Sequence, residues 1–425
     1  MNKRLIIDSK ALSRLACLIA TIIACNDLTK IKLGNGLFNY LIYIILVLVC
    51  VAALLLKPKL QTSLALLLWS LFYLVILSSS INVGLLFSGV NIRIFAVIVY
   101  LTILCIEDFD QVKIGIYVII GYSFFQALGI YLQVLFPGAY ENIFNLITVF
   151  FNLQEGGTSY EKLRDYGYFR GFCINPGFTA IYIVNGIICL NIFKEKISKY
   201  KYFIINSSLI IALVLTGKRG QLLAFVIGFA VVYIVCSNNL VSHLRHVFGV
   251  VAIMLILYSV GFYLYVHYPD IPGFSRTLNL VYGSNTDFNR LTSGRANLWD
   301  VAVLLYRENK VFGIGWNQYL HIRGMLPHNT YLQILCELGG VGIILFLSSL
   351  VVTLVSSIKT FVNSLSSDNS GYEKPLLKAF IFFQVYFIVY SVSGNTLWDP
   401  PAYYMYFILM AISKKYMAKI VRLKI

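Results

Sequence analysis

One histidine lies where a proton acceptor would be useful. His328 stands in the run Pro327-His328-Asn329-Thr330, where a long polar segment meets an apolar stretch. Histidine is the side chain that most readily accepts a proton near neutral pH, so His328 is a candidate general base. A lone histidine at a helix start can equally be an interfacial residue held by hydrogen bonds. The other four histidines have weaker contexts: His243, His246, His267 and His321.

Two adjacent cations form a second candidate feature. Lys218 and Arg219 lie in the run Leu215-Thr216-Gly217-Lys218-Arg219-Gly220, a very short turn between two apolar stretches. Two positive charges held side by side repel each other unless an anion lies close to them, and the flanking glycines allow close approach of backbone to a ligand. The turn therefore favours an anionic ligand. Anchoring to lipid headgroups is an equal alternative.

Two further arginines occur in polar segments beside apolar stretches. Arg295 precedes the stretch 298–305 in Ser293-Gly294-Arg295-Ala296, and Arg170 lies in Tyr168-Phe169-Arg170-Gly171. The planar guanidinium binds phosphate through two hydrogen bonds, so both are candidate phosphate ligands. Arginines at a membrane surface also commonly extend toward the headgroups with their stems in the apolar layer, and that role is open for each.

Aromatic and acidic side chains near the same segments could bind sugar. Trp299 follows Arg295, and Asp399 lies in Asn395-Thr396-Leu397-Trp398-Asp399-Pro400. Flat indole rings suit the C–H faces of sugars, and a carboxylate can accept a hydrogen bond from a hydroxyl. Membrane interfaces, however, are enriched in Trp and Tyr in any case.

Asp108-Phe109-Asp110 has the spacing of a metal-binding pair, but the connection in which it lies is so short that a solvated loop is the better interpretation. No Cys/His cluster has metal-ligand spacing, so we expect neither metal nor cofactor.

Composition places these residues in a membrane protein. Of 425 residues, 59% are hydrophobic and only 12% are charged, against about a quarter charged in soluble domains. Long uncharged runs without strand-like alternation predict an all-α polytopic protein of about 12 transmembrane helices. The predicted spans are residues 11–25, 37–56, 62–80, 90–106, 114–136, 174–193, 202–217, 219–236, 247–268, 330–356, 376–393 and 400–413.

Basic residues set the predicted orientation. With both termini in the cytoplasm, the short inner segments hold 20 of the 34 basic residues, as the positive-inside rule requires. Most of the formal net charge of +16 is therefore explained by topology, and no nucleic-acid partner is implied. The outer segments hold nine Arg and five Lys, whereas the inner segments hold four Arg and 16 Lys. This bias suggests an anionic ligand outside, with phosphate the leading choice.

The chain 1–425 is predicted to form a single transmembrane domain with two long outer segments. These span residues 137–173 and 269–328, and the second contains the stretch 298–305 that could form an interfacial helix. Long loops on one face of a helical bundle are usually functional. Only Glu337 among the acidic residues lies well inside a span, and the two halves of the chain show no similarity, which disfavours a transporter. We interpret Glu337 as structural.

Several of these runs together resemble the O-antigen polymerase and ligase superfamily, of the Wzy and WaaL type. The resemblance is strongest where His328-Asn329 is followed after nine residues by Gly339-Gly340-Val341-Gly342, preceded by Gly294-Arg295 with Trp299, and by Phe312-Gly313-Ile314-Gly315. Weaker support comes from Thr216-Gly217-Lys218-Arg219, where Lys218 replaces the serine common in the family, and from Arg170-Gly171-Phe172.

The resemblance implies a helical core similar to C-type glycosyltransferase folds and a multi-pass protein of the bacterial cytoplasmic membrane. It implies glycosyl transfer from undecaprenyl diphosphate at the outer face, with His328 as the base and Arg219 and Arg295 near the diphosphate. Arg170, Lys218, Asn329, Trp299 and Asp399 are the expected substrate-binding residues. The expected partners are undecaprenyl-diphosphate-linked oligosaccharide, membrane lipid and a chain-length regulator protein.

A capsule or O-antigen polymerase is the leading hypothesis for the function. A ligase that passes glycan to lipid A core, protein or wall polymer, and a lipid-linked oligosaccharide flippase, are the alternatives.

Overall fold

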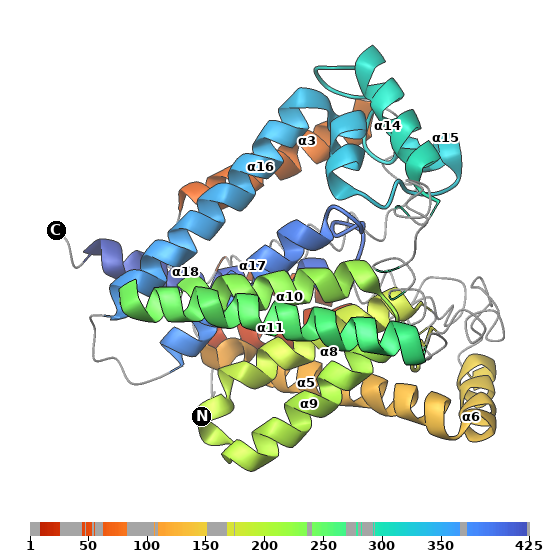
Figure 1. The fold of residues 1–425 in the computed structure, drawn as a ribbon. Helices are drawn as coiled ribbons and strands as arrows, with labels where there is room; N and C mark the ends of the chain where they lie inside the picture. Colours follow the sequence, from red (N-terminus) through yellow and green to blue (C-terminus); the bar gives the residue numbers. More distant parts are fainter. Residues whose placement is uncertain are drawn as a thin grey trace, which may run out of the picture.

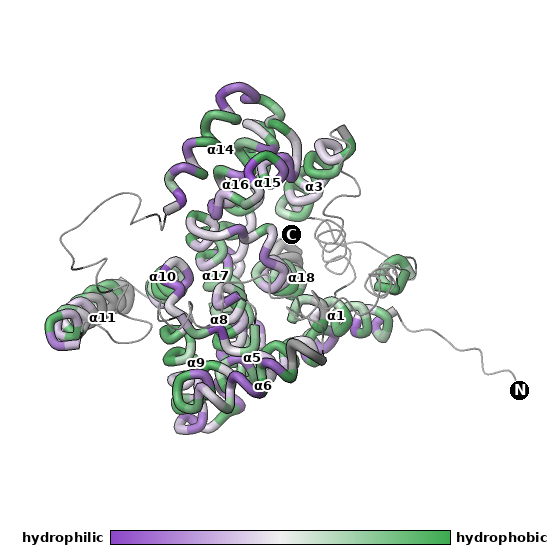
Figure 2. Tube along the Cα trace, turned by 90° about the vertical axis from the view of Figure 1, so that its right-hand side faces the viewer, coloured by the Kyte–Doolittle hydropathy of each residue, from purple (hydrophilic) through white to green (hydrophobic). Residues whose placement is uncertain are grey.

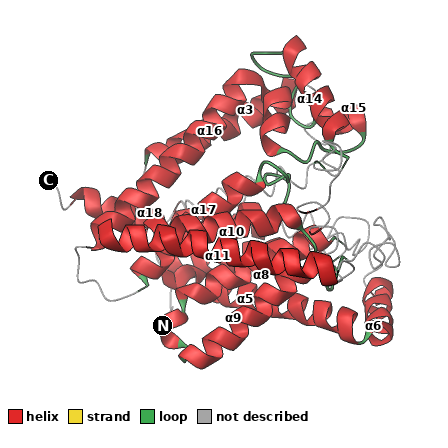
Figure 3. Ribbon diagram, in the orientation of Figure 1, coloured by secondary structure: helices red, strands yellow, loops and turns green. Residues whose placement is uncertain are grey.

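The computed structural model describes residues 9–25, 63–82, 109–150, 168–173, 175–235, 240–268, 294–365 and 372–422, with isolated positions between them. The described residues form helices joined by turns and short loops, with no strand among them (Figure 3). This agrees with the predicted all-α class.

Ten predicted spans coincide with helices of the described residues. The other two, 37–56 and 90–106, lie wholly or mostly outside that part of the chain. By length and composition, three described helices could cross a membrane: α3, α5 and α16. The number of spans and their orientation therefore stay predictions. The ten helices are α1 (Ser9–Cys25), α3 (Leu64–Asn82), α5 (Phe109–Leu135), α8 (Pro176–Ile192), α9 (Lys199–Leu215), α10 (Arg219–Val235), α11 (Leu240–His267), α16 (Thr330–Leu365), α17 (Glu373–Tyr390) and α18 (Pro400–Arg422).

Polar side chains define where several of these helices begin. The side chain of Asn175 accepts from the backbone N–H of Gly177 at 2.7 Å, and Pro176 occupies the first turn of α8. Ser198 caps α9 by accepting from Lys201 N. A cap provides a partner for an N–H group that has none within the helix, and proline lacks the N–H at its position.

Helix α17 lies at the centre of the bundle. It packs against α8, α10, α16 and α18, and a view along the helices shows it near the middle, between α10 and α18 (Figure 2). Its residues from Phe380 to Phe387 are all buried. A helix that is apolar on every side must be surrounded by other elements, so this composition accounts for its position.

An aromatic cluster joins α3, α16 and α18. The buried ring of Trp69 packs edge-on against Phe346, Tyr406 and Phe407, with centroid distances from 4.8 to 5.9 Å. Its Nε1 also donates to Thr353 Oγ1 at 3.3 Å. The apolar contact area and the satisfied indole N–H together fix α3 beside α16.

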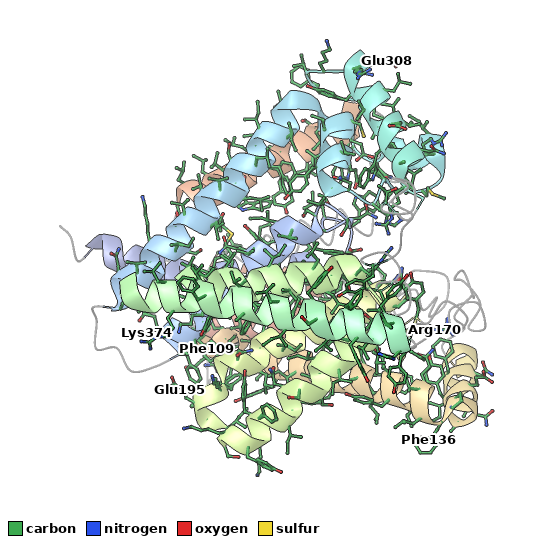
Figure 4. The ribbon with its side chains drawn as sticks, in the orientation of Figure 1. Phe109, Phe136, Arg170, Glu195, Glu308 and Lys374 are labelled. Carbon is green, nitrogen blue, oxygen red and sulfur yellow. The ribbon has the colours of Figure 1, made fainter. Side chains whose placement is uncertain are left out.

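The described helices of the predicted outer segments lie at one end of the bundle. Helices α6 (Pro137–Phe150), α14 (Ala296–Glu308) and α15 (Gln318–Arg323) are found there, as Figure 1 shows. Arg170 also lies at this end, whereas Phe109, Glu195 and Lys374 lie at the other (Figure 4). The stretch 298–305 is helical, as predicted. The segment 137–173 was expected as a loop but begins with α6, because Pro137 starts a new helix directly after α5.

Candidate functional site

His328 occupies a constrained position immediately before α16. Its φ is 53°, a left-handed conformation that non-glycine residues rarely adopt and that is common at functional sites. The next residue, Asn329, is buried and its Oδ1 accepts from Leu332 N at 3.0 Å, so it caps α16. The indole Nε1 of Trp299 donates to Pro327 O at 3.0 Å, which joins α14 to the residue before His328.

The loop between α17 and α18, residues 391–399, packs against this helix start. Thr330 makes four contacts with it. Thr330 N donates to Ser391 O at 2.8 Å, its Oγ1 donates to Gly394 O at 2.9 Å, and Thr396 N donates to that Oγ1 at 2.9 Å. The hydroxyl oxygens of Thr330 and Thr396 also lie 3.1 Å apart. Each of these groups is buried. Because buried polar groups without partners are costly, this network fixes the position of the 391–399 loop.

The 391–399 loop brings two of the three predicted catalytic residues together. Nδ1 of His328 lies 3.0 Å from Nδ2 of Asn395. Nη1 of Arg295 donates to Ser393 O at 2.7 Å. Arg295 reaches the loop from the start of α14, and His328 reaches it from the start of α16, so both predicted residues contact the same nine-residue segment.

The third predicted residue, Arg219, begins α10 beside the same loop. Gly217, with φ 66°, forms the tight turn after α9. The next glycine, Gly220, packs directly against the side chain of Ser393, and a Cβ at position 220 would overlap its hydroxyl. Arg219 is half-buried. Ser393, whose carbonyl accepts from Arg295, is therefore close to the turn that contains Arg219.

The electrostatics favour a neutral imidazole. Burial, and then the positive charges of Arg295 and Lys218, lower the pKa of His328 from 6.5 to about 4. At neutral pH His328 is therefore uncharged and able to accept a proton. Lys218 lies in the turn whose Gly220 packs against Ser393 of the same loop, and an anion between these charged groups would be stabilised.

Arg170 lies in a separate part of the outer end. Its guanidinium carbon is 4.0 Å from the centroid of the Phe144 ring in α6, and only 4% of the residue is exposed. Its backbone N–H donates to Gln133 Oε1 at 2.9 Å. Tyr168, two residues before Arg170, contacts the turn before α10: Lys218 Nζ lies 4.8 Å from the centroid of the Tyr168 ring. Arg170 itself does not contact the 391–399 loop.

Asp399 closes the 391–399 loop. Its Oδ2 accepts from Tyr390 OH at 2.9 Å, and its carbonyl accepts from Ala402 N at 3.0 Å at the start of α18. Asp399 and Asn329 thus both hold local structure. Contact of either residue with a substrate stays a prediction. Nearby, the rings of Trp316 and Trp398 stack at a centroid distance of 5.9 Å.

The two glycine-rich motifs predicted from the sequence meet at a break in α16. Gly339 has φ 66° and ψ −161°, which interrupts the helix. Residues 310–315 lie along the break: Ile314 N donates to Cys336 O and Gly315 N to Glu337 O, both at 2.9 Å, while Gly340 N donates to Lys310 O at 2.8 Å. A second segment thus satisfies the backbone groups released by the break, as a buried non-helical backbone requires.

Glu337 lies beside this break and is fully buried. Its Oε1 accepts from Tyr319 N in α15, and its Oε2 accepts from Gln333 Nε2, both at 3.2 Å. The carboxylate therefore connects α15 to α16, which fits the structural role expected from the sequence. The sequence also suggested a pairing with an arginine or a hydroxyl of a neighbouring helix, and that pairing stays a prediction.

The sequence reasoning missed Asn395 and Ser393. Asn395 lies 67 residues from His328, and no local spacing connects them. The signal that was available is the run Ser391 to Asp399 between two apolar stretches, in which only Asp399 was singled out. Within the described residues, no three His, Cys, Asp or Glu side chains gather as metal ligands would. The expected independence of metal stays a prediction.

A comparison with known families bears on this site. The sequence model of a family described as O-antigen ligase matches residues 204–347. The matched segment covers about a third of the chain and includes Arg219, Arg295, His328 and the broken part of α16. It confirms the resemblance to the O-antigen polymerase and ligase superfamily and does not separate polymerases from ligases. No curated protein matches the chain.

Proposed function

We propose that this integral membrane protein of the O-antigen polymerase and ligase superfamily is a polysaccharide polymerase that joins lipid-linked oligosaccharide repeat units. The observation that carries the proposal is the meeting of Arg295 and His328 on the 391–399 loop, against which the turn that contains Lys218 and Arg219 also packs. Cations beside a neutral base are what a glycosyl transfer from a diphosphate needs.

The reaction requires two kinds of help. A hydroxyl oxygen of the acceptor sugar attacks the anomeric carbon of the donor, the bond from that carbon to the diphosphate oxygen breaks, and the diphosphate leaves with the electron pair. The guanidinium of Arg295, with Lys218 and Arg219, stabilises the charge that develops on the leaving group. The hydroxyl proton passes to His328. Attack from the face opposite the diphosphate inverts the anomeric centre.

The proposed donor is a growing glycan on undecaprenyl diphosphate, and the acceptor is one further repeat unit on the same carrier, at the outer face of the bacterial cytoplasmic membrane. The Arg-rich predicted outer segments support this assignment because guanidinium groups suit diphosphate. Arg170, Trp299, Asn329 and Asp399 are proposed to support substrate binding at the same end.

The test gives purified protein in lipid nanodiscs one synthetic undecaprenyl-diphosphate repeat unit and no other acceptor. A ladder of products is expected, and His328→Ala should abolish it. His321→Ala is the matched control because His321 is exposed on α15, and its ladder should equal that of the wild type. A ladder that persists in His328→Ala would remove His328 from the reaction.

A ligase is the second candidate, since the matching family is described as O-antigen ligase. A ligase uses the same base and cations but a different acceptor. It would leave the repeat unit unreacted until lipid A core, a protein or a wall polymer is added, and the product would then be a single transfer. A flippase would move labelled lipid across sealed vesicles equally well with and without the His328 change.

A further inference from the structure

The contact between His328 and Asn395 can exist in two forms. A neutral imidazole carries its proton on one nitrogen only, and Asn395 contacts Nδ1. If the carboxamide presents Nδ2 to Nδ1, then Nδ1 holds the lone pair and Nε2 carries the proton. If it presents Oδ1, then Nδ1 carries the proton and Nε2 holds the lone pair. The two forms differ by a half-turn of the amide group.

The structure leaves both amide orientations equal in hydrogen-bond count. With Nδ2 toward His328, Oδ1 is buried and has no hydrogen-bond partner. The half-turn gives Oδ1 a donor and moves Nδ2 into the position that Oδ1 held. The backbone of Asn395 is fixed, because its carbonyl accepts from Trp398 N at 2.7 Å and from Asp399 N at 3.0 Å. The side chain is only 7% exposed, so water does not readily replace either contact.

Proton transfer distinguishes the two orientations. A base that has accepted a proton is an imidazolium, with N–H groups on both nitrogens. Nδ2 facing Nδ1–H would then oppose a donor to a donor beside Arg295 and Lys218, whose charges already disfavour the cation. Oδ1 facing Nδ1–H instead supplies the acceptor that the imidazolium needs. Only the second orientation is compatible with His328 before and after the transfer.

We propose that Asn395 is a positioning residue, whose Oδ1 accepts from Nδ1–H of His328 and so keeps the lone pair on Nε2 for the acceptor hydroxyl. This inference rests on the proposed function, because it concerns the base of that reaction. The fixed 391–399 loop therefore both binds Arg295 through Ser393 and selects the tautomer of His328.

The first test reads the tautomer directly, without substrate. The protein is labelled with ¹⁵N-histidine, reconstituted in lipid bilayers, and studied by solid-state NMR at pH 7, with His328→Ala used to assign the His328 signals. We expect the proton on Nδ1. A proton on Nε2 in the wild type would overturn the proposal, whatever the activity of any variant.

The second test uses two substitutions with opposite chemistry. Asn395→Asp keeps an acceptor toward Nδ1–H, so kcat should stay within about tenfold of the wild type. The carboxylate also stabilises the imidazolium, which should move the acid limb of the pH–rate profile to higher pH. Asn395→Leu removes the acceptor, and kcat should fall about 100-fold while KM changes less than about threefold. Asn363→Asp, on an exposed residue of α16, controls for the added charge and should shift nothing.

The outcomes separate this inference from the proposed function. If Asn395→Asp is as inactive as Asn395→Leu while both proteins fold, Asn395 acts as a donor and the inference is wrong. If His328→Ala retains full activity, the base itself is wrongly assigned, and the proposed function fails even where the NMR spectrum shows the proton on Nδ1.

Discussion

Nη1 of Arg295 donates to the backbone carbonyl of Ser393 at 2.7 Å. This single bond connects the first residue before α14 to the loop between α17 and α18, two segments almost 100 residues apart. A guanidinium has five N–H donors in a rigid plane, so anchoring one of them fixes the orientation of the whole group. A lysine at position 295 has three N–H donors on one rotating nitrogen, so the same anchor would not fix a plane that suits a phosphate group.

Replacing Arg295 by Gln should remove the charge and most of the anchoring. We expect kcat/KM to fall by about 10²–10³-fold, the range found when one electrostatic contact to a transition state is lost. Initial rates of chain extension measure the change. Arg307→Gln is the matched control, because Arg307 is exposed in the last turn of the same helix. An equal loss in both variants would show that Arg295 acts only through the overall charge of α14.

The pH dependence should report the environment of His328. Its pKa is lowered to about 4, and only the unprotonated imidazole accepts a proton. The rate at limiting substrate should therefore stay high as pH falls from 7 and decline only near pH 4. Bound diphosphate offsets the charges of Arg295 and Lys218, so the acid limb of kcat should lie at higher pH than that of kcat/KM.

Arg295→Gln provides an internal check on this profile. Removal of one nearby positive charge raises the pKa of His328, so the residual activity should decline at a higher pH than in the wild type. An acid limb that does not move would mean that a group other than His328 sets the profile.

Glu337→Leu should destabilise the protein without touching the reacting groups. The carboxylate offers both oxygens as acceptors, to Tyr319 N and to Gln333 Nε2. Leucine offers no acceptor, so both buried donors lose this partner, at a cost of about 1–3 kcal/mol each. The thermal midpoint in detergent should fall. Glu308→Leu, at an exposed residue at the end of α14, should leave it unchanged, and a fall of the same size there would argue against the buried contact as the cause.

The sequence was sufficient to predict the local features of the site. Apolar runs predicted α3, α5 and α16, and the polar segments between them contained Arg295 and His328, because both features depend on residues close together in the chain. The same reasoning could not find Asn395, which meets His328 only because α17 returns the chain to the start of α16. Nor could it find α6, since a helix on an outer segment needs no continuous apolar run.

The break in α16 also could not be predicted from the sequence. The glycine motifs at 312–315 and 339–342 were recognised as a signature, and each glycine alone is compatible with an unbroken helix or a turn. The two motifs form the break by packing against each other. The backbone of Gly313 lies against the Glu337 carbonyl, and the backbone of Gly339 lies against Val311. Such pairing depends on the absence of a Cβ on both sides, which no spacing within either motif reveals.

Gly339→Ala tests whether this pairing supports the fold. The backbone at Gly339 has φ 66° and ψ −161°, a region nearly restricted to glycine and costing other residues about 1–3 kcal/mol. A Cβ there would also overlap the backbone of Val311, so residues 310–315 must move away from α16. We expect a lower thermal midpoint and loss of chain extension together.

Gly121→Ala is the control for this substitution. A Cβ at this glycine of α5 meets nothing within 4 Å, and alanine favours a helix over glycine by about 1 kcal/mol. Its midpoint should equal or exceed that of the wild type. Equal midpoints for Gly339→Ala and the wild type would mean that α16 can continue through the break, and that residues 310–315 need no glycine to bind there.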